Sequence, residues 1–147
     1  MPLTVELVTA ERTVLQRDDV QRLIVPTTEG QITILPSHVP LMTALGFGEM
    51  VAGTPQGPIA MAVFGGFLQV ARNVVTVLAD SAERADEIDE ARAEAARERA
   101  QRRISGVAPD RDEAIDQLRA QLALQRALLR LRVRRRHGAT GVPSMRT

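Results

Sequence analysis

Residues 74–103 read VVTVLADSAERADEIDEARAEAARERAQRR, and the chain changes its character within them. The first residues are mostly β-branched or apolar, as in a strand, whereas Ala, Glu and Arg dominate after residue 84, as in a helix. Before Ala85 there are thirteen Gly or Pro residues and thirteen charged ones. In residues 85–136, by contrast, 23 of 52 residues are charged and only Gly106 and Pro109 break the run. The sequence therefore predicts two parts, and we interpret the second as a movable or docking element.

Short apolar segments separated by turn signals fill the part before Ala85. The predicted strands are residues 3–9, 20–25, 31–35, 48–52, 59–64, 67–71 and 74–78. A tight turn between strands is predicted at Gly65-Gly66. The connections are too short for a crossover helix, so the strands should pair antiparallel. We predict an antiparallel β-sandwich or flattened barrel over residues 1–84.

Residues 85–136 have the charge pattern of two helices. Acidic residues at 86–90 and Arg residues at 97–103 suit the start and the end of a helix over about 86–104, because of the helix dipole. A turn at 105–109 and a capping box of Asp110 with Glu113 predict a second helix from about 110 to 135. Two helices with a short connection form an antiparallel hairpin. Residues 137–147 have no periodicity and are predicted to be a disordered tail.

The second helix is apolar on two sides. One group of residues falls within a sector of about 60°, and a second group lies roughly opposite. The first group is Ile115, Leu118, Leu122, Leu129 and Val133, and the second is Leu124, Leu128 and Leu131. Either both sides are buried within the chain, or one of them contacts another protein.

Arg residues form a further stripe on each helix. On the second helix they are Arg119, Arg126, Arg130 and Arg134, and on the first helix Arg92, Arg99 and Arg103 share a side with Ile88. Most stripes of this kind are simply solvated. If the two stripes faced each other, however, the converging guanidinium groups would need an anion such as phosphate.

Composition excludes several kinds of active site. The chain has no Cys, Trp or Tyr, and all nineteen basic residues are Arg. Thiolate chemistry, a Walker-type lysine and aromatic stacking platforms are therefore absent. The only histidines are His38, in an irregular loop between two prolines, and His137, so no multi-histidine metal centre can form. Carboxylates before Ala85 are scattered, and we expect no catalytic residues.

The N-terminus lacks the layout of a signal peptide, and no apolar run approaches the roughly 20 residues of a membrane span. We therefore expect the chain to stay in the cytoplasm. A nucleic-acid-binding module is the alternative interpretation, because Arg132, Arg134, Arg135 and Arg136 cluster at the end of the second helix. The missing aromatic and lysine residues and the acidic helix starts weigh against it.

Three motifs in order resemble the epsilon subunit of F-type ATP synthases, over about residues 3–131. The first is Gly30 followed by ILPSHVPL at 34–41, and the second is GGFLQV at 65–70 leading into NVVTVLAD at 73–80. The third is AERA at 82–85 followed by IDEARA at 88–93. The combination of these motifs with a β-domain and a helical hairpin is what makes the resemblance specific.

This resemblance implies a non-catalytic subunit of the central stalk, which couples rotor and catalytic head while a proton gradient drives ATP synthesis. The family's sandwich binds the gamma subunit and the ring of c subunits, here with Glu29 and His38 as contact residues. Its hairpin can extend toward the alpha and beta subunits and restrain ATP hydrolysis; the expected beta contacts are Arg119, Arg126, Arg130 and Arg134. The subunit would lie peripherally at the cytoplasmic face of the plasma membrane, without nucleic acid and without a required cofactor.

The resemblance further implies ATP as a regulatory ligand of the compact hairpin. The family's nucleotide signature is matched by Ile88, Asp89, Arg92 and Ala93. Corresponding positions add Glu83 and Arg99 and, on the second helix, Arg126 and Arg130. Arginines would hold the phosphates, and Asp89 with the backbone near Ile88 would meet the base or ribose. Binding only to the compact form would favour that form. An ATP sensor without any ATPase partner would share this site.

Overall fold

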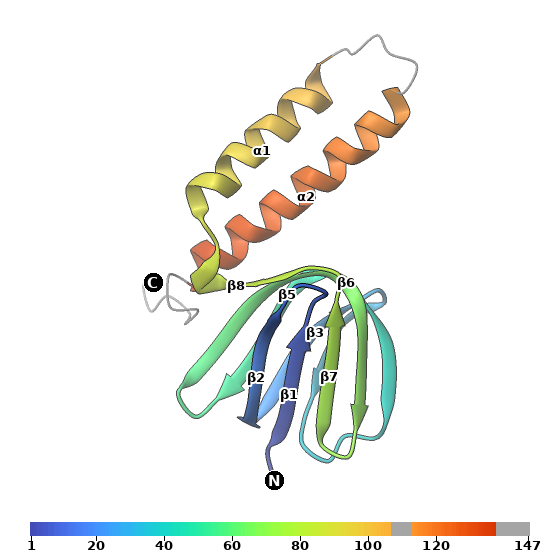
Figure 1. Cartoon of the computed structure of the whole chain (residues 1–147), viewed down its shortest axis with the longest axis vertical. Coiled ribbons are helices and arrows are strands. Elements are labelled where there is room, and N and C mark those ends of the chain that lie inside the picture. Colours follow the sequence, from blue (N-terminus) through green and yellow to red (C-terminus); the bar gives the residue numbers. More distant parts are fainter. Residues whose placement is uncertain (107–112, 138–147) are drawn as a thin grey trace.

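The computed structural model describes residues 1–106 and 113–137. The strands form a curved, open sandwich, and an antiparallel pair of helices lies on one side of it, the second helix against the strands (Figure 1). The strands are β1 Leu3–Val8, β2 Thr13–Val20, β3 Arg22–Thr27, β4 Gly30–Ile34, β5 Leu41–Thr54, β6 Gly57–Ala71, β7 Val74–Ala79 and β8 Ala82–Arg84. A single 3-10 turn, η1 (Ala85–Glu87), is followed by α1 (Glu90–Ser105) and α2 (Glu113–His137). The predicted combination of a β-sandwich and two C-terminal helices is confirmed.

The strands belong to one eight-stranded sheet with the order β2-β1-β7-β6-β5-β3-β4, and β8 pairs with β6 beyond the end of β7. The sheet is mostly antiparallel and does not close. The prediction that every pair is antiparallel is wrong for β1 and β7, which run parallel from Thr4↔Val74 to Val8↔Leu78. Short connections restrict only neighbouring strands, whereas β1 and β7 are brought together by all the strands between them.

Strand β6 is continuous through Gly65 and Gly66, so the tight turn predicted there is wrong. One edge of β6 pairs with β8 up to Val63 and with β7 from Gly66 onward. The two glycines have φ angles of 82° and 125°, and a Cβ on Gly66 would lie 2.1 Å from the carbonyl oxygen of Leu78. Glycine is therefore needed because β6 bends here, where its pairing changes from β8 to β7. The chain does not reverse its direction at these glycines.

Two further strands were not predicted from the sequence. Strand β2 contains Arg17, Asp18 and Asp19, which hide its alternation, and β8 has only three residues. The inward-facing residues of all layers form one core, which includes Leu3, Leu7, Leu23, Ile34, Met50, Met61, Leu68 and Val77, each almost fully buried.

The first helix begins later than the acidic pattern predicts. After η1, Ile88 and Asp89 are extended, and Asp89 is the N-cap of α1, where its side chain accepts a hydrogen bond from the backbone N–H of Arg92 at 3.1 Å. Asp86 and Glu87 thus precede the helix. Most of the turn predicted at 105–109, from Val107 onward, lies outside the described residues. Asp110 of the predicted capping box also lies outside them. His137 is the last residue of α2 instead of part of a tail, and residues 138–147 lie outside the description.

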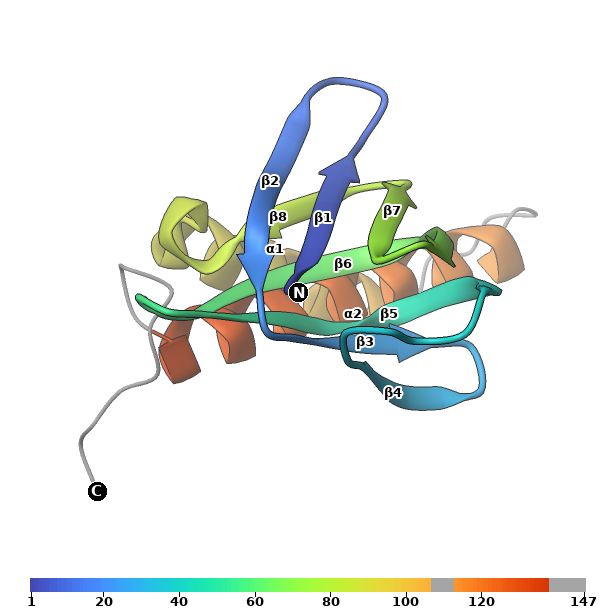
Figure 2. The ribbon, with the colours of Figure 1, turned by 90° about the horizontal axis from the view of Figure 1, so that it is seen from below.

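Helix α2 packs on the sandwich with one side, as Figure 2 shows from below. Leu129 and Val133 are buried against Ala60, Ala62 and Phe64 of β6 and against Ala85 and Ile88 at the junction. On the other side Leu131 is buried, whereas Leu128 is 47% exposed; Leu118, from the first group, is 56% exposed. Both sides are thus partly covered within the chain. No described helix is long and apolar enough to span a membrane.

Candidate functional site

A pocket of about 410 Å³ lies where the hairpin meets the sandwich. It combines the end of the sheet, the start of α1 and one residue of α2. The residues that line it are Glu83, Glu87, Asp89, Arg92, Ala93, Ala96, Arg99 and Arg130. Six of the eight residues that the resemblance implies for a nucleotide site are among them, so the structure brings together chain segments more than 40 positions apart.

Arg130 closes the pocket from the side of α2. Its Nε donates to Oε1 of Glu83 at 2.7 Å, and its guanidinium lies 4.8 Å from the ring centroid of Phe64. Both charged side chains are about one-quarter exposed. Stacking on the ring and pairing with Glu83 therefore hold the guanidinium in a fixed plane at the edge of the pocket.

The start of α1 supplies the opposite wall. Asp89 and Ala93 are fixed by the cap and by the first helical hydrogen bond, Ala93 N–H to Asp89 C=O at 3.0 Å. The side chains of Arg92 and Arg99 make no hydrogen bond or ion pair with any described residue. These two guanidinium groups are available to an anion in the pocket.

Two predicted pocket residues take other places. Ile88 has its side chain buried in the apolar cluster beneath α2, at 2% exposure. Arg126 lies over the ring of Phe47, 5.7 Å from its centroid, and does not line the pocket. Arg126 is one helical turn before Arg130, about 6 Å along the axis of α2. This displacement places it over the ring of Phe47 on β5 instead of at the pocket.

Glu87 was not predicted and is the most heavily paired carboxylate of the pocket. Arg12, from the β1–β2 loop, donates from Nη1 and Nη2 to its two oxygens at 3.2 and 2.5 Å, and Nη2 of Arg84 lies 2.7 Å away. The hydrogen bond from Arg12 above all holds the pKa of Glu87 below its ordinary value. Because Glu87 is neutralised from outside, Arg92 and Arg99 are left to give the pocket its positive character.

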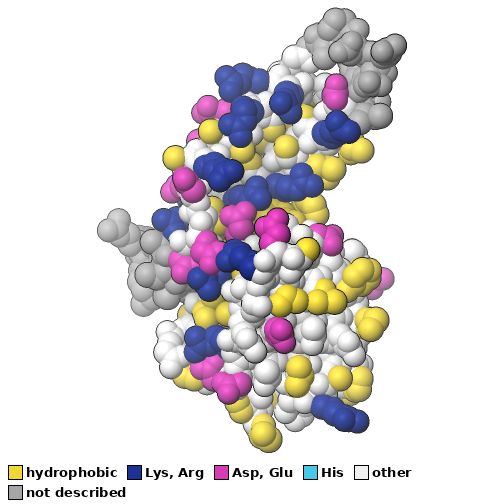
Figure 3. All heavy atoms as spheres, in the orientation of Figure 1, with side chains coloured by type: hydrophobic (Ala, Val, Ile, Leu, Met, Phe, Trp, Pro, Cys, Tyr) yellow, Lys and Arg dark blue, Asp and Glu magenta, His cyan; other side chains and the backbone are white. Residues whose placement is uncertain are grey.

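The remaining arginines of the second helix do not share one role. Arg134 donates to the carbonyl oxygen of Ala85 at 3.2 Å, and Arg119 is exposed. Arg135 pairs with Glu90 and Glu94 of α1, at 2.7 and 3.2 Å. Figure 3 shows the basic side chains spread along the hairpin and acidic ones gathered at its junction with the sandwich.

The predicted rotor contacts Glu29 and His38 lie at opposite ends of β4. Glu29 is exposed in the turn between β3 and β4, and His38 is in the loop after β4, with Nδ1 2.7 Å from the carbonyl oxygen of Val39. That loop is tied to the β6–β7 turn, because the backbone N–H of Ser37 donates to Oδ1 of Asn73 at 2.6 Å.

Around these two loops the sandwich exposes large apolar side chains, which we call the apolar rim. Phe67 and Leu78, 63% and 56% exposed, are directly opposite each other on β6 and β7. The other members are Leu35, Val39, Met42 and Val74. Figure 3 shows several groups of exposed apolar side chains on one face of the sandwich. A group of exposed apolar residues of this size is typical of a protein contact surface.

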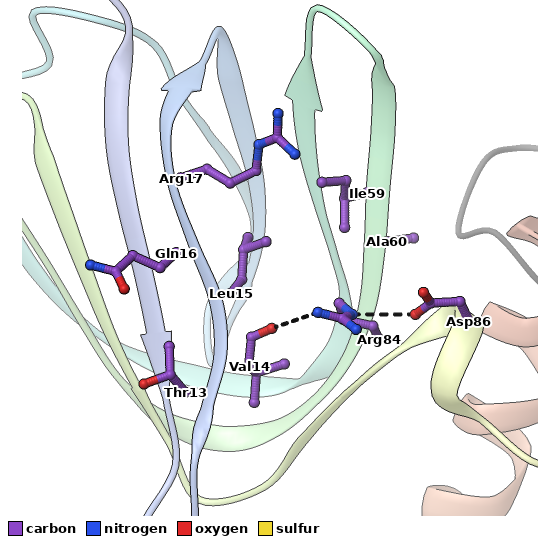
Figure 4. A pocket seen from close by; sticks show the side chains of 9 residues that line it. All are labelled: Thr13, Val14, Leu15, Gln16, Arg17, Ile59, Ala60, Arg84 and Asp86. Atoms are coloured by element: carbon purple, nitrogen blue, oxygen red, sulfur yellow. Dashed lines mark hydrogen bonds and ion pairs between the residues drawn. The ribbon is translucent and has the colours of Figure 1, made fainter.

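A second pocket lies at the open edge of the sandwich, between β2 and the β6–β8 edge (Figure 4). Its Arg84 donates to the carbonyl oxygen of Val14 and to Oδ1 of Asp86, both at 3.3 Å. Its Arg17 is paired with Asp19. The charges of both guanidinium groups are thus already compensated. Arg84 connects β8 to β2 across the edge of the sheet, and the pocket does not offer an anion site.

Comparison with known proteins agrees with this architecture. The family model described as ATP synthase, Delta/Epsilon chain, beta-sandwich domain matches residues 2–85. The model described as ATP synthase, Delta/Epsilon chain, long alpha-helix domain matches residues 86–134. The chain belongs to the delta/epsilon chain family of ATP synthases. The resemblance inferred from the three motifs is confirmed.

Relatives from several bacteria are about half identical to this member of the family. Over 96 residues it is 54% identical to the ATP synthase epsilon chain of Roseiflexus sp. (strain RS-1), covering 65% of this chain and 68% of that one. For the epsilon chain of Pelotomaculum thermopropionicum the identity is 50% over 100 residues, with coverage of 68% and 74%.

Solved structures show the same fold at lower identity. A chain of the Euglena gracilis mitochondrial ATP synthase, OSCP/F1/c-ring in rotational state 1, matches with a TM-score of 0.71 at 21% identity, over 84% of this chain and 76% of that one. A chain of the central stalk and c-ring of the Tetrahymena thermophila mitochondrial ATP synthase matches with a TM-score of 0.59 at 16% identity, over 91% and 97%.

Proposed function

We propose that this chain is a non-catalytic epsilon subunit in the central stalk of a membrane-associated F-type ATP synthase. Membership of the delta/epsilon chain family supports the assignment to the complex. The apolar rim supports attachment to other subunits, because Phe67, Leu78 and their neighbours would be buried by a partner. We assign the sandwich to the gamma-type subunit and the c-ring, with His38 and Glu29 as candidate contacts.

The hairpin is the regulatory part of this proposal. In the compact form α2 covers Ala60, Ala62 and Phe64 with Leu129 and Val133, a contact small enough to be exchanged for another. Extended, the hairpin would reach the alpha and beta subunits with Arg119, Arg126, Arg130 and Arg134 and restrain ATP hydrolysis. Three of these four arginines contact the sandwich or the junction in the compact form, so extension would release them.

We propose ATP as the ligand of the junction pocket. The observation that carries this proposal is that Arg92 and Arg99 of α1 and Arg130 of α2 line one pocket, which exists only while the hairpin is compact. A triphosphate would take the two unpaired guanidinium groups, and Asp89 would face the sugar or base. By binding the compact form alone, ATP would hold the hairpin away from the catalytic subunits.

Titration calorimetry with ATP on the whole chain tests the ligand. Arg92→Ala should weaken binding by about tenfold or more, because it removes a charged contact to phosphate. Arg97→Ala is the matched control, since Arg97 is on the same helix but pairs with Glu94 and Gln101 outside the pocket. Absence of binding heat with the unaltered chain would end the ATP proposal.

Removal of residues 85–147 tests the division of roles. We expect the remaining sandwich to bind a gamma-type subunit, because its own core and the apolar rim are retained. The assembled enzyme should hydrolyse ATP without restraint. Loss of assembly together with the hairpin would contradict the proposed separation of attachment and regulation.

A further inference from the structure

The side of the sheet that faces α2 carries two carboxylates among apolar residues: Glu83 of β8, which is opposite Ala62 and pairs with Arg130, and Glu49 of β5. On β5 and β6 the cross-strand pairs there are Phe47↔Phe64, Glu49↔Ala62 and Val51↔Ala60. All the partners of Glu49 on this surface are apolar, and its side chain is only 12% exposed. A carboxylate in such surroundings destabilises the fold unless a charged or hydrogen-bonding partner compensates it.

His137, at the end of α2, is that partner. Its Nε2 lies 2.5 Å from Oε1 of Glu49, and the residue is 4% exposed, whereas the preceding Arg136 is 68% exposed. Nη1 of Arg136 lies 3.7 Å from the other carboxylate oxygen, beyond hydrogen-bond distance. The last turn of α2 thus directs one polar side chain inward onto the carboxylate of β5.

The pair is incompletely satisfied. Oε2 of Glu49 and Nδ1 of His137 are both buried without a hydrogen-bond partner among the described residues. A buried polar pair of this kind contributes little net stability compared with apolar side chains of similar size, but it specifies one geometry, because any other register leaves the carboxylate uncompensated. In water both groups would be fully solvated, so separation of the hairpin relieves this deficit.

We propose that Glu49 and His137 form a register latch, which fixes where α2 ends on the sandwich and lets the hairpin leave at low cost. The latch rests on the proposed function, since it needs a hairpin with two positions. It lies apart from the junction pocket, whose lining includes neither residue. The compact form is therefore selected by two separate contacts, one that a ligand can strengthen and one built into the chain.

Cysteine reactivity in the whole chain tests this proposal, because the chain has no cysteine of its own. In the background Val133→Cys, a thiol reagent reaches the buried sulfur when the hairpin opens; in the background Val63→Cys, it reports global unfolding. Both positions are fully buried, one under α2 and one in the sandwich core. The rates are compared without nucleotide for the unaltered latch, Glu49→Leu, His137→Leu and both changes together.

His137→Leu should raise the rate at residue 133 about tenfold or more, because the buried carboxylate loses its hydrogen bond and keeps only the exposed Arg136 at 3.7 Å. Glu49→Leu should raise it less, since the polar group that it leaves buried is an imidazole instead of a carboxylate. The double change should return the rate to that of the original chain or below it. Arg132→Leu, at an exposed position of α2, should have no effect. Rates at residue 63 should stay constant throughout.

Two results would overturn the latch and can be told apart. If residue 133 reacts faster than residue 63 but neither single change alters its rate, or the double change reacts as fast as His137→Leu, the hairpin opens and the pair does not control it. If residues 133 and 63 react at the same rate in every variant, the hairpin does not separate from the sandwich, and the proposed regulatory function fails with the latch.

Discussion

Arg130 on α2 and Glu83 on β8 are 47 positions apart in the chain and are joined by a 2.7 Å hydrogen bond between charged groups. This contact links the last strand of the sandwich to the second helix of the hairpin. The guanidinium is also stacked on Phe64, which belongs to the apolar cluster beneath α2. One side chain therefore takes part in hairpin docking, in the aromatic contact and in the junction pocket.

Replacement of Arg130 by Lys separates charge from shape. Lys keeps a positive charge near Glu83 but lacks the flat guanidinium that stacks on Phe64. We expect hairpin docking to weaken by about 1 kcal/mol, and a double-mutant cycle with Phe64→Leu to show coupling of similar size. Hydrogen exchange of the α2 amides measures the opening free energy. Additive effects of the two changes would exclude a stacking contribution.

Leu129 and Leu128 are neighbours on α2 with opposite surroundings, which makes them a matched pair. Leu129 is 4% exposed in the cluster with Ala60 and Phe64, whereas Leu128 is 47% exposed. Leu129→Ala should weaken docking by about 2–4 kcal/mol, since it leaves a cavity, and Leu128→Ala by less than about 1 kcal/mol. Energy transfer between dyes on cysteines at exposed Gln31 and Gln121 reports the shift. Equal effects would mean that this face does not carry the docking.

Sequence patterns were sufficient for the parts of this fold that depend on local order. The strand-to-helix change near Ala85 and the alternation in β1 and β7 are visible in the residue types alone, and they correspond to elements of the structure. By contrast, the charged residues of β2 conceal a strand that is fixed by pairing with β1. The parallel pairing of β1 with β7 depends on contacts more than 60 positions apart and has no local signal.

The candidate site shows the same division. Six of its residues were implied by the resemblance to the family and by helical alignment with it, and these six line the pocket. The sequence analysis did not predict roles for Glu87, Arg12 or the Glu49–His137 pair. Each of these residues acts through a partner 75 or 88 positions away in the chain, which no local pattern reveals. A lone carboxylate on an otherwise apolar strand face was the one available signal for Glu49. That carboxylate indicates that Glu49 has a polar partner, but the sequence does not show which residue the partner is.

The bend of β6 predicts a large penalty at Gly66. Its φ of 125° is unfavourable for any residue with a Cβ, and that atom would lie 2.1 Å from the carbonyl oxygen of Leu78. Gly66→Ala should destabilise the chain by more than about 3 kcal/mol, from strain and collision together. Gly30→Ala is the control, because Gly30 has a similar φ of 123° but open space around it. Urea unfolding gives both values, and similar losses at the two positions would show that the collision is relieved.

The pairing of Glu87 with Arg12 predicts how stability changes with pH. The hydrogen bond from Arg12, followed by the charges of Arg84 and Arg12, lowers the pKa of Glu87 in the folded chain from its ordinary value of 4.5. A lowered folded-state pKa means that the stabilisation is complete above pH 4.5 and is lost as the pH falls through the lower value.

Glu87→Gln should therefore unfold at lower urea concentration than the original chain at pH 7, and the difference should shrink as the pH falls below about 4.5. The control is Glu94→Gln, which weakens exposed contacts to Arg97 of α1 and Arg135 of α2 and should have a smaller effect at pH 7. Urea midpoints at pH 7, 5 and 3 decide the matter. A difference that stays constant across this range would show that Glu87 acts through its shape and not through its charge.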